Sequence, residues 1–190
     1  MAEEMVYQLK VTLRGSRPPI WRRTQVPKNV TLDRLHQILQ VIMGWTDSHL
    51  HQFRVGDTHY GTPDPEYGFE VKDEKKVRLD AVLHRPRARL VYEYDFGDGW
   101  EHDVVLEKTV SATPDRRYPL VLAGKRRCPP EDVGGIGGYY HFLQAIADPK
   151  HPEHRDMSEW CGESFDPDAF DVQEVNAAFH GGWRRRRPVV

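Results

Sequence analysis

The chain has 190 residues and a mass of 22.1 kDa, which is room for one domain with an ordinary hydrophobic core. Its 27 Lys and Arg against 29 Asp and Glu give a net charge of −2, which argues against a general polyanion-binding surface. An aromatic content of 11% excludes a disordered chain. No apolar run approaches the ~18 residues of a membrane span, so no membrane partner is expected. Two cysteines that are 33 positions apart indicate reduced thiols in a cytoplasmic protein.

The charges are segregated along the chain. Residues 1–127 carry a balance of +3, residues 128–183 carry −9, and Arg184, Arg185, Arg186 and Arg187 add +4. We expect these parts to neutralise one another within the fold or between subunits.

The N-terminal third predicts a hairpin followed by a helix. Val6 to Arg14 alternates apolar and polar residues, and Ile20 to Val26 is a second extended run after a Gly-Ser-Arg-Pro-Pro break. A helix over 31–43 is predicted next, with Thr31 as its N-cap and Gly44 just beyond its end. Its apolar residues recur at helical spacing: Leu32, Leu35, Ile38, Leu39 and Ile42.

The middle third predicts a short strand at 51–55 and a longer hairpin over 88–108. Two registers are open for this hairpin. A two-residue turn at Asp98-Gly99 places its two apolar sets on opposite faces. A three-residue loop, Gly97 to Gly99, pairs Phe96 with Trp100 and brings both sets to one face, so we prefer it.

The last third predicts a short strand at 120–123, a glycine loop at 134–138, and helices near 139–147, 151–160 and 171–179. Asp171 and Glu174 stand in the capping-box positions of the last helix. Strands first and helices last indicate an α+β fold, an antiparallel sheet from two hairpins with a packed helix and a helical C-terminal third. We expect a single domain over 1–180 and a basic, flexible tail over 181–190.

Five ordered segments resemble the plasmid pRiA4b ORF-3-like family. They are PPIWRR at 18–23, LHQILQ at 35–40 leading to Gly44-Trp45, HLHQF at 49–53, YEYDFGDGWEH at 92–102, and CPPEDVGG at 128–135. The resemblance covers Tyr7 to Phe179. It implies a compact α+β fold with no established activity, and some relatives carry names that link them to mobile elements.

A metal site is one candidate. His49 and His51 leave the same face if both stand on a strand, and Asp47 joins them if that strand extends backwards. Zinc accepts nitrogen, oxygen and sulfur donors, so further candidate ligands come from other segments: Cys128, Glu131, Asp132, His141 and His102. The competing interpretation is structural: the histidines bond to the backbone or to carboxylates, and Cys128 is packed. No cofactor other than a divalent metal is suggested.

The acidic hairpin is a second candidate. In the preferred register Asp95 faces Glu101 and Glu93 faces Asp103, and like charges in these positions require compensation. The structural explanation is an arginine on a neighbouring strand: Arg22, Arg23, Arg87 or Arg89. The arginines clustered at the first hairpin can play the same part: Arg14, Arg17, Arg22 and Arg23. The functional explanation is a bound cation or acid–base work by paired carboxylates. In the two-residue register Asp95 instead lies opposite His102, as in an oriented general base.

We therefore predict one cleft that gathers most of the polar motif residues: His49, His51, Asp95, Asp98, Trp100, His102, Cys128, Glu131 and Asp132. The function favoured is a non-catalytic binding or interaction module linked to plasmid or mobile-element biology, with a protein partner or a second copy. One alternative is a metal-dependent hydrolase that uses this cleft, so enzyme status stays open. Another is a weak nucleic-acid binder that uses Arg22, Arg23, Arg184, Arg185, Arg186 and Arg187.

Overall fold

A mostly antiparallel sheet forms the body of the protein in the computed structural model, which describes residues 4–64, 70–162 and 164–180. The order of its eight strands is β5-β4-β3-β6-β7-β1-β2-β8, and of these pairs only β4 and β5 run parallel. The strands are β1 (Met5–Leu13), β2 (Trp21–Pro27), β3 (His51–Val55), β4 (Thr58–Gly61), β5 (Val71–Asp73), β6 (Arg89–Tyr94), β7 (Trp100–Ser111) and β8 (Leu120–Lys125). The helices are α1 (Leu32–Met43), α2 (Gly135–Ala147), α3 (His154–Cys161) and α4 (Val172–His180), with short 3-10 turns η2 (Glu74–Lys76) and η3 (Leu79–Ala81).

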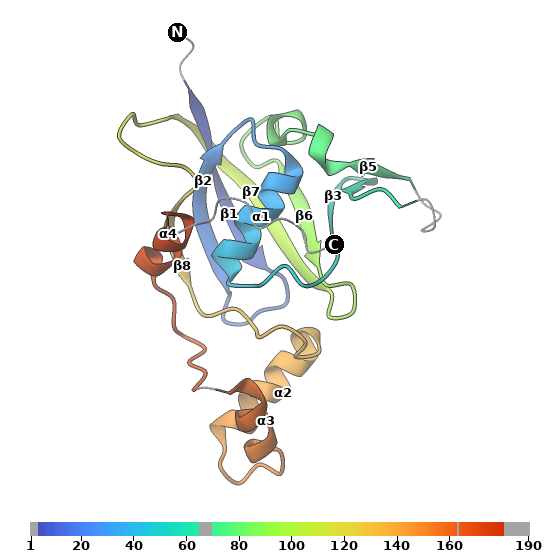
Figure 1. Ribbon diagram of the computed structural model, residues 1–190, viewed down its shortest axis with the longest axis vertical. Helices are drawn as coiled ribbons and strands as arrows, with labels where there is room; N and C mark the ends of the chain where they lie inside the picture. The colour runs from blue at the N-terminus through green and yellow to red at the C-terminus, as the bar shows by residue number, and fades with distance from the viewer. Residues whose placement is uncertain (1–3, 65–69, 163, 181–190) are drawn as a thin grey trace.

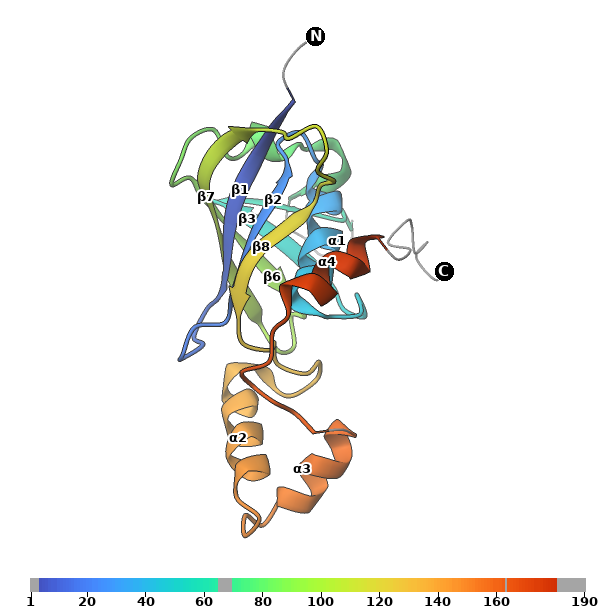
Figure 2. The ribbon, with the colours of Figure 1, turned by 90° about the vertical axis from the view of Figure 1, so that its left-hand side faces the viewer.

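The helices divide into two groups. Figure 2 shows α1 and α4 against one face of the sheet, whereas α2 and α3 project beyond its end as an arm. Helix α1 lies across the sheet in Figure 1 and buries its whole apolar stripe, each of these residues being at most 1% exposed: Leu32, Leu35, Ile38, Leu39 and Ile42. No helix among the described residues has the length and apolarity to cross a membrane. The α+β fold is confirmed.

The N-terminal predictions are confirmed with small shifts in their ends. Strands β1 and β2 pair as the predicted hairpin, and α1 covers 32–43. Gly44 adopts φ 86° and donates its backbone N–H to the Gln40 carbonyl at 2.8 Å, as a C-terminal cap does. Thr31 occupies the N-cap position, but its side chain makes no capping hydrogen bond.

The preferred register of the second hairpin is wrong by two residues. Tyr94, not Phe96, lies opposite Trp100, so the connection is a five-residue loop from Asp95 to Gly99. Asp95 adopts φ 56°, and its carbonyl accepts the Gly99 N–H at 2.6 Å, which closes the loop. A shift of two residues preserves the faces, so both apolar sets do face the core.

Arginines compensate the acidic hairpin, and Arg14, one of the cluster predicted at the first hairpin, is among them. Glu93 lies opposite Glu101 in the observed register. Arg14, directly after β1, binds Glu101 and Asp103 at 2.7 Å each, and Arg54 on β3 binds Glu101 at 2.8 Å. Arg54 was not predicted, because its role depends on which strand flanks the hairpin on that side.

The C-terminal helices begin at different residues from those predicted. Gly135 to Gly138 are not a loop but the first turn of α2, and α3 begins at His154. Helix α4 follows the prediction, because the Asp171 carboxylate accepts the backbone N–H of Gln173 at 2.6 Å. Residues 181–190, and with them the predicted basic tail, lie outside the described residues, so the domain boundary at 180 stays a prediction.

Candidate polar site at the start of strand β3

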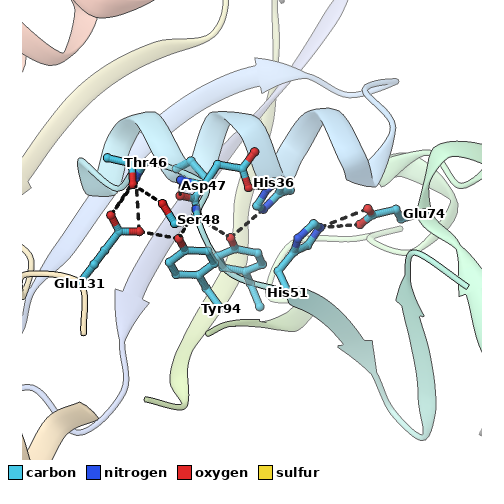
Figure 3. A network of polar contacts seen from close by, with 10 residues as sticks. His36, Thr46, Asp47, Ser48, His51, Glu74, Tyr94 and Glu131 are labelled. Atoms are coloured by element: carbon cyan, nitrogen blue, oxygen red, sulfur yellow. Dashed lines mark hydrogen bonds and ion pairs between the residues drawn. The ribbon is translucent and has the colours of Figure 1, made fainter. Parts of the chain in front are cut away.

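A short segment, residues 46–51, carries several of the polar groups of this region: Thr46, Asp47, Ser48, His49 and His51. It connects the end of α1 to β3 and lies across the ends of the neighbouring strands (Figure 3). Its first residue, Thr46, binds Glu131 through the backbone N–H and through the side-chain hydroxyl. The Ser48 N–H donates to the Tyr94 hydroxyl at 3.0 Å. These bonds hold the loop against β6 and against the segment that precedes α2.

One group of possible metal ligands contains His36, Asp47 and His51, whose ligand atoms lie within 4.8 Å of one another. The two imidazole rings are stacked, with centroids 3.4 Å apart and planes 1° from parallel. His36 Nε2 is 2.7 Å from Asp47 Oδ1, and His51 Nε2 is 2.9 Å from a carboxylate oxygen of the buried Glu74. Each of these ring nitrogens therefore already has a hydrogen-bond partner.

The hydrogen bonds around His36 also fix its tautomer. The Gln40 amide donates to the Tyr92 hydroxyl at 2.9 Å, and that hydroxyl lies 2.8 Å from His36 Nδ1. Because Asp47 only accepts, Nε2 carries the proton and Nδ1 accepts from Tyr92. Burial lowers the pKa of His36, which keeps it neutral. This chain of bonds is complete without an ion, so we interpret the group as a structural network.

The second group of possible metal ligands contains His49, Asp95 and Asp132. His49 Nε2 is 3.2 Å from Asp132 Oδ1 and 3.7 Å from Asp95 Oδ2. This nitrogen is buried and makes no hydrogen bond within the described part of the chain, so neither oxygen lies along the direction of a ring N–H. The ring itself is held edge-on against Tyr94, with centroids 5.8 Å apart. The three possible ligand atoms thus lie within 4.8 Å of one another, and the ring nitrogen among them makes no hydrogen bond.

The backbone positions the two carboxylates by unusual means. Asp95 and Asp132 have φ of 56° and 60°, in the left-handed region that residues other than glycine seldom adopt. The Asp95 Oδ1 atom accepts the N–H groups of Gly97 and Asp98, which leaves Oδ2 for His49. The Asp132 side chain is 71% exposed, so this group opens to solvent on one side. Left-handed residues that are held by their surroundings cluster at functional sites.

Glu131 belongs to a separate contact beside this group. It accepts a hydrogen bond from the Tyr94 hydroxyl as well as those from Thr46, as Figure 3 shows. Burial, and secondarily this bond to a carboxylate, raise the pKa of Tyr94. The Tyr94 ring also stacks on Trp45, with centroids 5.0 Å apart. The position of His49 is therefore supported from the core.

The predicted cleft residues do not all meet. Asp98 lies at the contact with α2, where its carboxylate accepts the Gly134 N–H at 3.1 Å. Trp100 and His102 are core residues with no exposed surface. Cys128 is buried, lies 3.3 Å from the Arg22 guanidinium, and belongs to neither group of possible ligands. His49 and His51 do not share a strand face, because β3 begins only at His51, and each belongs to a different group.

Two of the six arginines named for nucleic-acid contacts, Arg22 and Arg23, have partners within the fold. Arg22 is 2% exposed and donates to the carbonyls of Ile42, Trp21 and Lys125. Arg23 forms a two-point ion pair with Glu107 at 2.7 and 2.8 Å. The other four, at 184–187, lie outside the described residues.

Sequence reasoning missed His36 and Glu74. His36 follows Leu35 on α1, and helical spacing places it at the edge of the buried stripe, which was the available signal. Glu74 lies in a 3-10 turn far along the chain, and only the β4–β5 pairing brings it to His51. No local pattern marks that contact.

Comparisons with known proteins identify the family of this chain. The family model described as plasmid pRiA4b ORF-3-like protein matches residues 5–174. The chain is 44% identical to the uncharacterized protein y4hQ of Sinorhizobium fredii (strain NBRC 101917 / NGR234) over 175 residues, which cover 91% of this chain and 90% of that one. The crystal structure of MM3350 from Methanosarcina mazei Go1, a protein of unknown function, has a TM-score of 0.83 and 39% identity. That likeness covers 92% of this chain and 98% of the other. The chain therefore belongs to the plasmid pRiA4b ORF-3-like family.

Proposed function

We propose that this protein is a binding module for one divalent cation, held by His49 Nε2, Asp95 Oδ2 and Asp132 Oδ1. The observation that supports it is the buried His49 Nε2, which makes no hydrogen bond although two carboxylate oxygens lie 3.2 and 3.7 Å away. Oxygens that merely accepted a ring proton would lie along the N–H direction. A cation placed among the three atoms uses all of them at once.

The donor set indicates the class of cation. One imidazole and two carboxylates suit zinc or manganese, whereas calcium and magnesium prefer oxygen donors alone. Two carboxylates and a neutral histidine balance the charge of a divalent ion. Three protein ligands leave coordination positions open, as in sites where the metal meets a ligand from solution.

Counting bound ions in the wild type and three variants tests the proposal. The protein is purified without a histidine tag, stripped with EDTA, dialysed, and titrated with Zn²⁺ or Mn²⁺ by calorimetry. His49→Ala should bind one equivalent fewer than the wild type. Asp132→Asn keeps the shape of the side chain and lies at an exposed position. It should weaken metal binding by more than about tenfold, since even changes in residues that only support the ligands reduce metal affinity by about 10–100-fold.

His84→Ala is the matched control. His84 is an exposed histidine whose ring bonds the Asp80 carbonyl, and it belongs to neither group of possible metal ligands. This variant should keep the full count of ions. Equal stoichiometry and affinity in the wild type, His49→Ala and Asp132→Asn would exclude the site.

A metal-dependent hydrolase is the second candidate, and the open side at Asp132 favours it. The zinc- or manganese-loaded protein is assayed with p-nitrophenyl phosphate and p-nitrophenyl acetate. Turnover that is lost in His49→Ala supports an enzyme, and ion binding without turnover supports the binding module.

The remaining parts of the proposal concern the cellular location, the link to plasmids and nucleic-acid binding. Cys128 and Cys161 are both free thiols, which supports a reducing, cytoplasmic location. The link to plasmid or mobile-element biology rests on the family name. We do not propose nucleic-acid binding, because Arg22 is buried and Arg23 is paired with Glu107.

A further inference from the structure

Large apolar side chains are exposed at three places within the described residues: Leu50 is 56% exposed, Phe96 44% and Trp160 48%. Every other large apolar residue among those described is at least partly covered. Isolated exposed apolar residues are common on protein surfaces and need no explanation. Their positions in this chain are the informative feature.

Two of the three are chain neighbours of proposed cation ligands. Leu50 follows His49, and Phe96 follows Asp95. The Leu50 carbonyl accepts the Asp95 N–H at 2.8 Å, so a backbone hydrogen bond fixes the two segments side by side. Trp160, on α3 in the projecting arm, belongs to a different part of the molecule and contacts Phe142.

We infer that Leu50 and Phe96 form an apolar rim of the cation site, and that the ligand of this site is a small molecule with two parts. One part is an anionic oxygen donor that takes the open coordination positions. The other is an apolar group that packs on Leu50 and Phe96. This inference rests on the proposed function, since the donor part requires the bound ion.

The chemistry of each part follows from the site. The open side at Asp132 admits a ligand from solution, and oxygen donors suit zinc and manganese. Removing the exposed leucine and phenylalanine side chains from water is favourable in free energy. A ligand whose apolar group covers them therefore binds more tightly. The rim therefore acts as a specificity determinant, and the ion supplies the anchor.

A matched pair of chelating probes separates the two parts. Acetohydroxamate and benzohydroxamate present the same bidentate oxygens and differ in a methyl against a phenyl group. The zinc-loaded full-length protein is titrated with each by calorimetry, and the ratio of the two dissociation constants is the readout. We expect benzohydroxamate to bind at least about tenfold more tightly, the effect typical of a modest apolar contact.

Three proteins are compared. The double variant Leu50→Ser/Phe96→Ser should bring the ratio close to one while the number of bound ions stays at the wild-type value. Trp160→Ser, the control for loss of an exposed aromatic residue, should keep the wild-type ratio.

The outcomes distinguish this inference from the proposed function. If no ion binds to His49, Asp95 and Asp132, the proposed function fails and neither probe binds. If the ion binds but the wild-type ratio is near one, or the double variant keeps the wild-type ratio, the apolar rim is refuted and the cation site stands.

Discussion

Histidine 102 should make the stability of this protein depend on pH, and replacing it should remove that dependence. The ring is fully buried on β7. Its Nδ1 lies 3.3 Å from the Tyr92 carbonyl, so Nδ1 carries the proton in the neutral ring. Its Nε2 is buried and has no partner among the described residues, so a second ring proton would find no acceptor. Burial lowers the pKa of His102 to about 4.

The sign and size follow from linkage. Above pH 6.5 the ring is neutral in both the folded and the unfolded chain, and His102 adds no pH dependence. Between pH 6.5 and 4, His102 is protonated in the unfolded chain but stays neutral in the folded chain. The free energy of unfolding therefore falls as pH falls. A difference of about 2.5 units at 1.36 kcal/mol each gives a loss of about 3 kcal/mol by pH 4.

His102→Leu, a change of similar volume, tests this estimate. Urea unfolding is followed by tryptophan fluorescence at pH 7.0, 5.5 and 4.5, with EDTA present. The wild type should lose about 1.4 kcal/mol per pH unit more than the variant below pH 6.5. His84→Leu, at an exposed histidine, is the control and should follow the wild type. An unchanged slope in His102→Leu would refute the reasoning, whatever the variant's stability at pH 7.

Two further predictions concern packing and capping, both measured by urea midpoint at pH 7. Gly124→Ala should lower the free energy of unfolding by about 1–3 kcal/mol, because a Cβ there would lie 2.4 Å from Phe170 Cε1 and 2.9 Å from Arg22 Cδ. Gly137→Ala in α2 is its control, since nothing lies within 4 Å and helix propensity favours alanine by up to about 1 kcal/mol. Similar effects at both glycines would contradict the packing argument. Asp171→Ala should cost about 1 kcal/mol by removing the acceptor for the N–H groups of Gln173 and Glu174. A midpoint that does not move would show that α4 does not depend on this cap.

The fold could be predicted from the sequence where local signals are strong. The alternation in β1, the apolar stripe of α1 and the cap of α4 each depend on neighbours within a few residues, and each is observed. The hairpin register failed because Asp95 adopts a left-handed conformation and starts a five-residue loop, in which its carboxylate accepts the N–H groups of Gly97 and Asp98. The Gly-Asp-Gly pattern alone does not distinguish this loop from a shorter one.

The residues of the candidate site could also be predicted only in part. Polar residues in the family motifs include His49, Asp95 and Asp132, and the structure brings these three together. The sequence could not separate them from Trp100 and His102, because alternation assigns those two to the apolar face but does not say whether that face lines a cleft. Their complete burial answers that.

The loop at 46–51 limits where this chain tolerates rearrangement. Its successive residues contact different segments: Thr46 binds the 131 region, Asp47 binds α1, His49 faces two loops, and His51 binds η2. Adding or removing one residue in this loop would move the following residues away from their present partners. A tag, a domain insertion or the new ends of a circular permutant therefore belong elsewhere. The exposed turn at Gly56-Asp57 between β3 and β4 is a better place for them.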